Sequence, residues 1–138
     1  MHKSIIILAE TLRGRPAEAL NVMGHLSQAI GAQAKGSADA RFVDYQDQEG
    51  GRYPGISWWP LICLSGRPTK MWAYWDELVS RDLPRGAFFE TMLTGGSEEQ
   101  VRKTAEHARP DLPLLGVAVF GEAAVLDPLG RKFSLWKA

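Results

Sequence analysis

Apolar residues follow two patterns along this chain, and the alternation between the patterns predicts its fold. Short, nearly unbroken apolar runs occupy residues 5–8, 56–64, 87–92 and 112–120. Runs of this length predict strands, and the first one does not alternate with polar residues, which is typical of a strand covered on both faces. We therefore expect residues 5–8 in the middle of a sheet.

Between these runs, apolar residues recur at three and four positions, which is the spacing of one helix face. Pro16 suits a first helical position because of its fixed φ and absent N–H, and it predicts a helix over residues 16–31. A second helix begins at Pro68. A third begins at Ser97, where Ser97 and Gln100 have the capping-box spacing, and runs to about His107.

The remaining segments carry weaker signals. Between residues 33 and 54 only 42–43 indicate a short strand, as one arm of a hairpin. Pro60 cannot donate to a ladder, so we expect the strand over 56–64 to lie at an edge or to be bulged, with Trp58 and Trp59 on opposite faces. Gly24 indicates a close approach between the first helix and a strand. Residues 127–130 predict a turn, and 132–136 predict a last edge strand.

Composition excludes several classes of protein. Sixteen basic and sixteen acidic side chains cancel, which removes the general attraction of a dedicated nucleic-acid or anionic-membrane binder. The longest apolar runs are about half the length that spans a bilayer.

A chain of 138 residues predicts a single α/β domain over 1–138. With one cysteine, Cys63, and no signal peptide before Ser4, we expect a cytoplasmic protein.

Ligands of open α/β sheets bind beyond the carboxyl ends of the strands, so four loops are candidates, at residues 11–15, 65–67, 91–97 and 121–122. Arg13 and Arg15, at the start of the first helix, either hold an anion or are solvated at the surface. The segment 94–97 lacks the lysine of a P-loop, which favours helix capping over phosphate binding.

Few groups in the chain suit catalysis or metal binding. His25 borders the apolar stripe of the first helix, where an imidazole acts as a base, is buried and hydrogen-bonded, or faces the surface. Glu90 and Glu10 form a carboxylate pair only if the first and third strands end side by side. Cys63 lies in an apolar strand, so we expect a buried, inert thiol. No histidine or cysteine spacing suits a metal, and we expect no metal and no cofactor.

Four segments of the chain are similar, in order, to the landmarks of a small bacterial family, domain of unknown function 2000. They are Lys3-Ser4-Ile5-Ile6-Ile7, Leu20-Asn21-Val22-Met23-Gly24-His25-Leu26, Tyr53-Pro54-Gly55-Ile56-Ser57 and Leu115-Gly116-Val117-Ala118-Val119-Phe120-Gly121. That family resembles the type II peptidyl-tRNA hydrolase fold. The resemblance implies a three-layer α/β/α sandwich with a mixed, mostly parallel sheet of about four strands.

Those hydrolases cleave the ester that joins a peptide to tRNA, and their motif residues are largely replaced here. Leu12 and His25 fall on matching positions, whereas the motif's aspartate becomes Thr11, its Gly-Lys pair becomes Ala17-Glu18 and its glutamine becomes Val22. The second motif, Asp-Ala-Gly-x-Thr, falls on Glu90-Thr91-Met92-Leu93-Thr94. Loss of the lysine removes a partner for phosphate or for the transition state.

Three hypotheses follow from these residues. The first is a non-catalytic protein that binds a small molecule, an anion or a partner in a cleft formed by Thr11, Arg13, His25, Glu90 and Thr94. The alternative is a hydrolase of peptidyl-tRNA-like or other ester or amide substrates, with His25 or Glu90 as base and Thr94 as an orienting hydroxyl. A second alternative is a self-associating structural protein, such as a homodimer, in which exposed Trp58 or Trp136 supplies an apolar contact.

Overall fold

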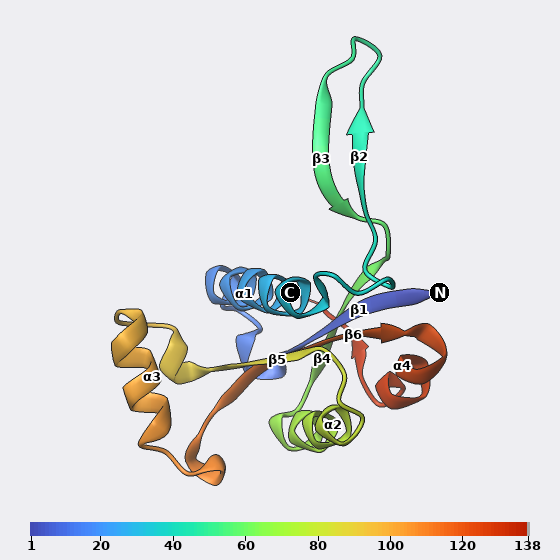
Figure 1. The fold of residues 1–138 in the computed structure, drawn as a ribbon. Helices are drawn as coiled ribbons and strands as arrows, with labels where there is room; N and C mark the ends of the chain where they lie inside the picture. The colour runs from blue at the N-terminus through green and yellow to red at the C-terminus, as the bar shows by residue number, and fades with distance from the viewer. Residues whose placement is uncertain (138) are drawn as a thin grey trace.

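The computed structural model describes residues 1–137, which form a five-stranded mixed sheet, a separate two-stranded hairpin and four α-helices (Figure 1). The sheet contains, in spatial order, β5 (Arg85–Phe89), β6 (Leu114–Glu122), β1 (His2–Ala9), β4 (Leu61–Gly66) and β7 (Ser134–Leu135). The helices are α1 (Pro16–Ala34), α2 (Pro68–Ser80), α3 (Ser97–Ala105) and α4 (Ala123–Gly130). Two short 3-10 turns, η1 (Glu10–Leu12) and η2 (Glu90–Met92), follow β1 and β5.

The sheet is mixed, as expected, and has five strands where about four are expected, but the expectation that it is mostly parallel is wrong. Among its four strand pairings, only β1 with β4 is parallel, while β6 runs antiparallel to both β1 and β5, and β7 runs antiparallel to β4. Phe89 at the end of β5 pairs with Leu114 at the start of β6. The segment containing α3 therefore leaves and re-enters the sheet at the same edge, and β6 must return antiparallel.

Strand β1 occupies the middle of this sheet, as its unalternating apolar run predicts. Its neighbours are β6 on one side and β4 on the other. Ile6 and Ile7 have no exposed surface, and Ile5 and Leu8 are 3% and 2% exposed. Successive strand side chains point to opposite faces, so this strand requires cover on both of them.

Helices provide that cover on both faces of the sheet (Figure 1). Ile6 and Leu8 of β1 pack in one apolar cluster with residues of α1, including Val22 and Leu26. Ile5 and Ile7 belong to the opposite cluster, which includes Met71 and Leu78 of α2 and Leu126 of α4. The even and odd positions of one strand thus join two separate cores.

The close approach between α1 and a strand occurs at Gly116 of β6, and the expectation for Gly24 is wrong. A Cβ atom at Gly116 would lie 2.7 Å from side-chain carbons of Leu26 and Val22. At Gly24 the same atom would meet nothing within 4 Å. The glycine that allows α1 to sit close to the sheet therefore belongs to the strand.

Three other predicted elements differ in the structure. The expected strand over 56–64 is two strands, because Trp58, Trp59 and Pro60 form the connection between β3 (Arg52–Ser57) and β4. Helix α4 replaces the turn expected at 127–130, with Leu126 fully buried against the sheet. The N-cap of α3 is Gly96 rather than Ser97, and the Gln100 side chain donates to the carbonyl oxygen of Gly95 at 3.0 Å.

Strands β2 (Phe42–Gln46) and β3 form a hairpin that projects away from the rest of the chain (Figure 1). The short strand indicated by residues 42–43 is therefore confirmed as a hairpin arm. Every residue of β3 is exposed, and so are four of the five residues of β2. We call residues 41–58 the arm. An isolated two-stranded hairpin is only marginally stable in water, so the exposure of this arm calls for an explanation.

Candidate functional site

The carboxyl ends of β1, β4 and β5 meet at one edge of the sheet. Strand β1 runs parallel to β4, and β5 has the same direction because β6 is antiparallel to both β1 and β5. The turns that follow these strands are consequently close in space. Arg13 Nη2 donates to Ser65 Oγ at 3.3 Å, and Arg15 Nη2 donates to Glu90 Oε1 at 3.1 Å.

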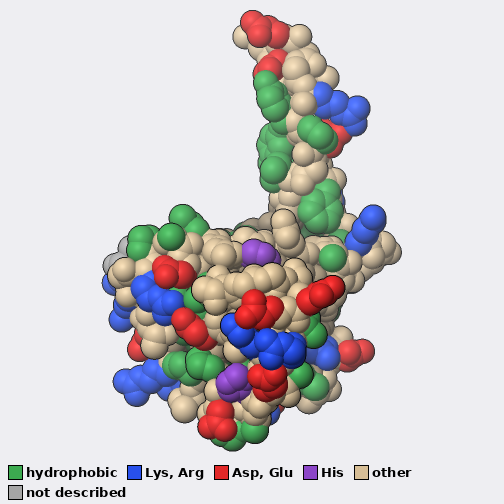
Figure 2. All heavy atoms as spheres, turned by 90° about the vertical axis from the view of Figure 1, so that its left-hand side faces the viewer, with side chains coloured by type: hydrophobic (Ala, Val, Ile, Leu, Met, Phe, Trp, Pro, Cys, Tyr) green, Lys and Arg blue, Asp and Glu red, His purple; other side chains and the backbone are tan. Residues whose placement is uncertain are grey.

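Glu90 and Thr94 share a surface hollow between the start of α1 and the residues after β5. The hollow has a volume of about 480 Å³ and is also lined by Arg15, Ala17, Glu18, Asn21 and Leu93. We call it the α1–η2 hollow. It lies on the side of the molecule that carries α3 and the start of α1, where acidic and basic side chains are interspersed (Figure 2).

Charges in the α1–η2 hollow are paired with one another. Besides its bond to Glu90, Arg15 places its Nε atom 3.6 Å from Glu18 Oε1. The hydrogen bond with Glu90 is the main reason that the pKa of Arg15 is raised above its ordinary value. One guanidinium thus faces two carboxylates, and the hollow offers little attraction for a phosphate.

His25 lines a second hollow, of about 380 Å³, on the neighbouring stretch of α1. Asn21 and Leu93 line both hollows, so the imidazole lies close to the α1–η2 hollow without entering it. The Nδ1 atom lies 3.0 Å from the backbone oxygen of Asn21, and the ring centroid lies 5.6 Å from that of Phe88. Of the three positions considered for His25, a catalytic base, a buried hydrogen-bonded residue or a surface residue, the structure shows the exposed surface position.

The five residues expected to form one cleft therefore separate into three groups. Glu90 and Thr94 lie together, His25 lies in the adjoining hollow, and Thr11 and Arg13 line neither of the two. Thr11 is exposed within η1, and Arg13 bridges the ends of β1 and β4. The partner of Glu90 is Arg15, a contact that neither expectation for Arg15, an anion ligand or a solvated surface group, includes.

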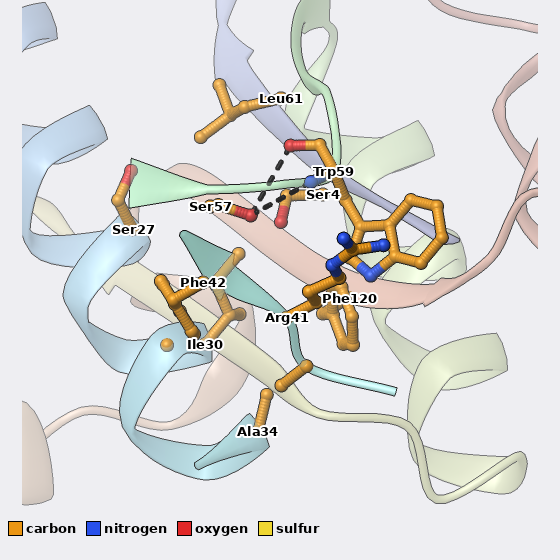
Figure 3. Close-up of a pocket in the computed structure, with 12 residues that line it drawn as sticks. Ser4, Ser27, Ile30, Ala34, Arg41, Phe42, Ser57, Trp59, Leu61 and Phe120 are labelled. Atoms are coloured by element: carbon orange, nitrogen blue, oxygen red, sulfur yellow. Dashed lines mark hydrogen bonds between the residues drawn. The ribbon is translucent and has the colours of Figure 1, made fainter. Parts of the chain in front are cut away.

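An apolar cavity lies at the base of the arm, where the sequence predicted no site. Its volume is about 190 Å³ and its lining is mainly apolar. Residues of α1 form one wall, and Trp59 and Phe120 lie across from them (Figure 3). Its apolar lining includes Ile30, Ala34, Phe42, Trp59, Leu61 and Phe120. An engineered cavity of about 150 Å³ accepts benzene, so this one has room for a molecule of similar size.

A few polar groups interrupt the apolar wall of this cavity. The hydroxyl of Ser57 accepts a hydrogen bond from the backbone N–H of Trp59 at 3.3 Å, and Ser27 donates to the backbone of its own helix. Arg41 also lines the cavity, and its Cζ atom lies 4.0 Å from the centroid of the Trp58 ring. No carboxylate in residues 1–137 forms an ion pair with Arg41.

One signal in the sequence marks this cavity. Pro60 cannot donate a hydrogen bond to a neighbouring strand, so it favours a break in the strand at this position. The Trp58-Trp59-Pro60 segment then indicates the base of a hairpin instead of the middle of a strand. Trp59 is held there because its indole N–H donates to the backbone oxygen of Asp39 at 2.7 Å. That bond joins residues 20 positions apart, which no local pattern indicates.

The two faces of the arm differ in chemistry. Cross-strand pairs on one face are Val43 with Ile56 and Tyr45 with Tyr53, and Arg41 over Trp58 extends this face toward the base. On the other face, Arg52 donates from Nε to Asp44 Oδ2 at 2.8 Å. Gly55, with φ +82°, sits at the bulge that keeps both apolar pairs on the same side. We call the first side the apolar face of the arm.

Comparison with known proteins places the chain in a family. The sequence profile described as "Protein of unknown function (DUF2000)" matches residues 2–137. The chain belongs to the DUF2000 family. The resemblance seen in the four sequence landmarks is thereby confirmed for the family itself.

A solved structure is similar to this DUF2000 chain over almost its whole length. It is the structure of a protein of unknown function from Agrobacterium tumefaciens, with a TM-score of 0.82 and 20% sequence identity. The match covers 99% of this chain and 98% of that one. At 20% identity the similarity shows that the two proteins share a fold, and it gives no information about activity. No curated protein matches the chain.

Within residues 1–137 no group of three or more histidine, cysteine, aspartate or glutamate side chains has a metal-binding arrangement. Over the same range, no helix has the length and apolar character needed to cross a membrane.

Cys63 is half-buried rather than fully buried, and burial raises the pKa of its thiol above the ordinary value. The protonated, less nucleophilic form is therefore favoured, in line with the inert thiol that the sequence suggests.

Proposed function

We propose that this DUF2000 protein is a non-catalytic binding protein on a three-layer, type II peptidyl-tRNA hydrolase-like fold, and that its ligand occupies the cavity at the base of the arm. The ligand class is a small, mainly apolar molecule with an anionic end, such as an aromatic or branched-chain carboxylate. The observation that carries the proposal is an apolar cavity of about 190 Å³ with an arginine among its lining residues.

The chemistry of the cavity supports this class. Ligand sites are typically concave and mainly apolar, with a small number of polar groups that fix orientation. Ile30, Phe42 and Phe120 suit the apolar body of a ligand, and Arg41 suits a carboxylate, which accepts charge-assisted hydrogen bonds from a guanidinium. The stacking of Arg41 on Trp58 holds the guanidinium close to the cavity before a ligand arrives.

A binding assay with matched ligands tests the proposal. Thermal unfolding and calorimetry are measured with benzoate and with benzyl alcohol, which has a similar ring and no charge. We expect benzoate to bind and to raise the melting temperature in a concentration-dependent manner. If no member of a panel of aromatic and branched-chain carboxylates binds at millimolar concentration, the proposal is wrong.

Two variants separate the roles of volume and charge. Ala34→Leu fills part of the cavity and abolishes binding, whereas Ala105→Leu, an equivalent change at an exposed position of α3, leaves binding unchanged. Arg41→Gln removes the preference for benzoate over benzyl alcohol, and Arg131→Gln at an exposed site retains it. Equal effects of cavity variants and their controls would contradict a site at the base of the arm.

Ester or amide hydrolysis is a second candidate, because Glu90 and Thr94 share one hollow with Arg15. Arg15 provides a basic group where the motif's lysine is lost, yet Glu18 and Glu90 both pair with it. A deacylation assay on peptidyl-tRNA decides between the candidates. We expect no turnover above background. Turnover that Glu90→Gln and Thr94→Ala abolish, and that His107→Ala leaves intact, would establish the hydrolase instead.

A further inference from the structure

We propose that the apolar face of the arm binds the same face of a second copy of this chain, so that two arms stack antiparallel about a two-fold axis. The proposal concerns a surface that shares Arg41 with the ligand cavity but extends from there to the tip of the arm, and it does not depend on a ligand. It rests on the pattern of side chains along the arm, on the charges at its two ends and on the area that it exposes.

The pattern on the apolar face has no explanation within one chain. Tyr45, Tyr53 and Ile56 are each 55% exposed, and Trp58 is 50% exposed. Along the same strands, Asp44 and Arg52 point to the opposite side. That side is polar except near the base, where Phe42 is 53% exposed and borders the cavity. Clean alternation between an apolar and a polar face is typical of a sheet with one buried face. Here the apolar face is regular in sequence but uncovered, and several hydrophobic patches lie along the projecting arm (Figure 2).

The face is complementary to itself when one copy is turned end to end. From base to tip, Arg41 with Trp58 is followed by Val43 with Ile56, then Tyr45 with Tyr53, and then Asp47, whose Oδ2 accepts from the Tyr53 hydroxyl at 2.6 Å. In an antiparallel stack the aliphatic pair of one arm faces the tyrosine pair of the other. A two-fold interface requires such a self-complementary patch.

Charge at the two ends of the arm favours this direction. The base carries Arg41, and the tip carries Asp47 and Glu49. These ends are about six residue pairs apart, or roughly 20 Å at the rise of a strand. An antiparallel stack brings the cationic base of each arm to the acidic tip of the other, twice per dimer. A parallel stack would place like charges together, which is unfavourable.

The exposed area meets what a specific pair requires. A large aromatic side chain carries roughly 150–250 Å², so the four half-exposed side chains present on the order of 400 Å², and Arg41, Val43 and Asp47 bring the face to about 500–600 Å². Two faces together then bury about 1,000–1,200 Å², which reaches the lower limit for a specific interface. A second copy therefore suffices to cover the face.

The test measures the mass of the full-length protein in solution by light scattering and sedimentation between about 1 µM and about 200 µM. We expect a concentration-dependent shift from 15.3 kDa to twice that mass. A protein that stays monomeric over this range overturns the proposal. The dimer is also expected to weaken with added salt, because its base-to-tip ion pairs are exposed.

Two variants of the arm locate the interface. Ile56→Asp places a charge on the apolar face and is expected to give a monomer at every concentration. Gln46→Asp adds the same charge to the polar face of the neighbouring strand and is expected to leave the dimer intact. Arg41→Glu is expected to weaken the dimer at least tenfold at low salt, because acidic groups then meet. Circular dichroism and the melting temperature verify that each variant is folded.

A dimer that survives Ile56→Asp in a folded variant overturns the proposal, since it must use another surface. Loss of the dimer in both Ile56→Asp and Gln46→Asp also overturns the assignment to one face. These outcomes are independent of the ligand assay. Ala34→Leu fills the cavity but leaves the apolar face untouched, so a variant with a dimer and without benzoate binding separates the two proposals.

Discussion

The sheet and the arm of this protein use similar residues in opposite ways. In β1, aliphatic side chains on both faces are covered by helices of the same chain, and none of residues 5–8 is more than 3% exposed. In the arm, aromatic and aliphatic side chains line one face of a hairpin and remain about half-exposed. The contrast teaches that an apolar pattern predicts burial without specifying which molecule provides the cover.

The two surface regions of the chain differ in the same instructive way. The α1–η2 hollow contains charged groups that already pair with one another, as in the contacts of Arg15 with Glu18 and Glu90. The base of the arm contains Arg41, which stacks on an aromatic ring beside an apolar cavity. Groups whose interactions within the chain are incomplete are the ones free to contact another molecule. This contrast is why we propose binding at the arm and its base.

The largest expected difference between sheet and arm concerns the free energy of unfolding. Ile7→Ala removes a side chain with no exposed surface and is expected to cost about 2–5 kcal/mol, the usual range for a fully buried aliphatic residue. Ile56→Ala in the arm is expected to change the stability by less than about 0.5 kcal/mol. Both are measured by urea unfolding at about 1 µM, where we expect the chain to be monomeric. Equal losses would show that the arm is packed within its own chain.

A smaller contrast is expected between two glycines near α1. Gly116→Ala is expected to destabilise the protein by about 1–3 kcal/mol, because the new methyl group would overlap Leu26 and Val22. Gly24→Ala is expected to stabilise it by about 0.5–1 kcal/mol, because the added methyl group meets nothing and favours the helix. The same unfolding assay measures both. A reversed order would place the close approach on the helix, as the sequence alone suggests.

The smallest expected effect is a difference in pH dependence between a tyrosine of the body and one of the arm. Tyr74 of α2 is 1% exposed, its ring lies edge-on to Phe133, and burial raises the pKa of its hydroxyl above the ordinary value. Above a pH of about 10 the unfolded chain therefore loses a proton that the folded chain retains. Titration of this hydroxyl therefore leaves the free energy of unfolding unchanged below that pH and lowers it as pH rises further.

Tyr74→Phe removes this titrating group and is expected to flatten the decline in unfolding free energy between pH 9 and pH 11, by up to about 1.4 kcal/mol for each pH unit above 10. Tyr45→Phe, at a half-exposed position of the arm, serves as the control and is expected to retain the decline. Parallel curves for the native protein and Tyr74→Phe would show that the hydroxyl is not buried in solution.

Much of the body could be predicted from residue patterns because its signals are local. The unalternating run of β1, Pro16 at the start of α1 and Pro68 at the start of α2 each depend on neighbouring residues and appear where expected. The direction of the strands could not be predicted from these local signals, because the antiparallel return of β6 depends on the pairing of Phe89 with Leu114. Pro128 and Gly130 predict a turn in place of helix α4. The helix forms because it buries Leu126 fully, and the sequence does not show this burial.

The candidate site was predicted only in part, and for a related reason. Glu90 and Thr94 come together because they follow the same strand, but the contact of Glu90 with Arg15 joins positions 75 residues apart. The apolar run over 56–64 predicts a single strand, so its pattern gives no indication of the hairpin base between Ser57 and Leu61 that lines the cavity. Proximity that arises from connections between distant segments leaves no periodic trace in a sequence.

Hydrogen–deuterium exchange of the arm provides the most direct measurement of the central claim, that the apolar face is covered by a second molecule. The backbone amides of residues 41–58 are followed at about 2 µM and about 200 µM protein, with the amides of β1 as an internal standard. We predict that the arm exchanges rapidly in the dilute sample and at least tenfold more slowly in the concentrated one, while β1 remains protected in both. Exchange in the arm that is identical at the two concentrations would contradict the claim.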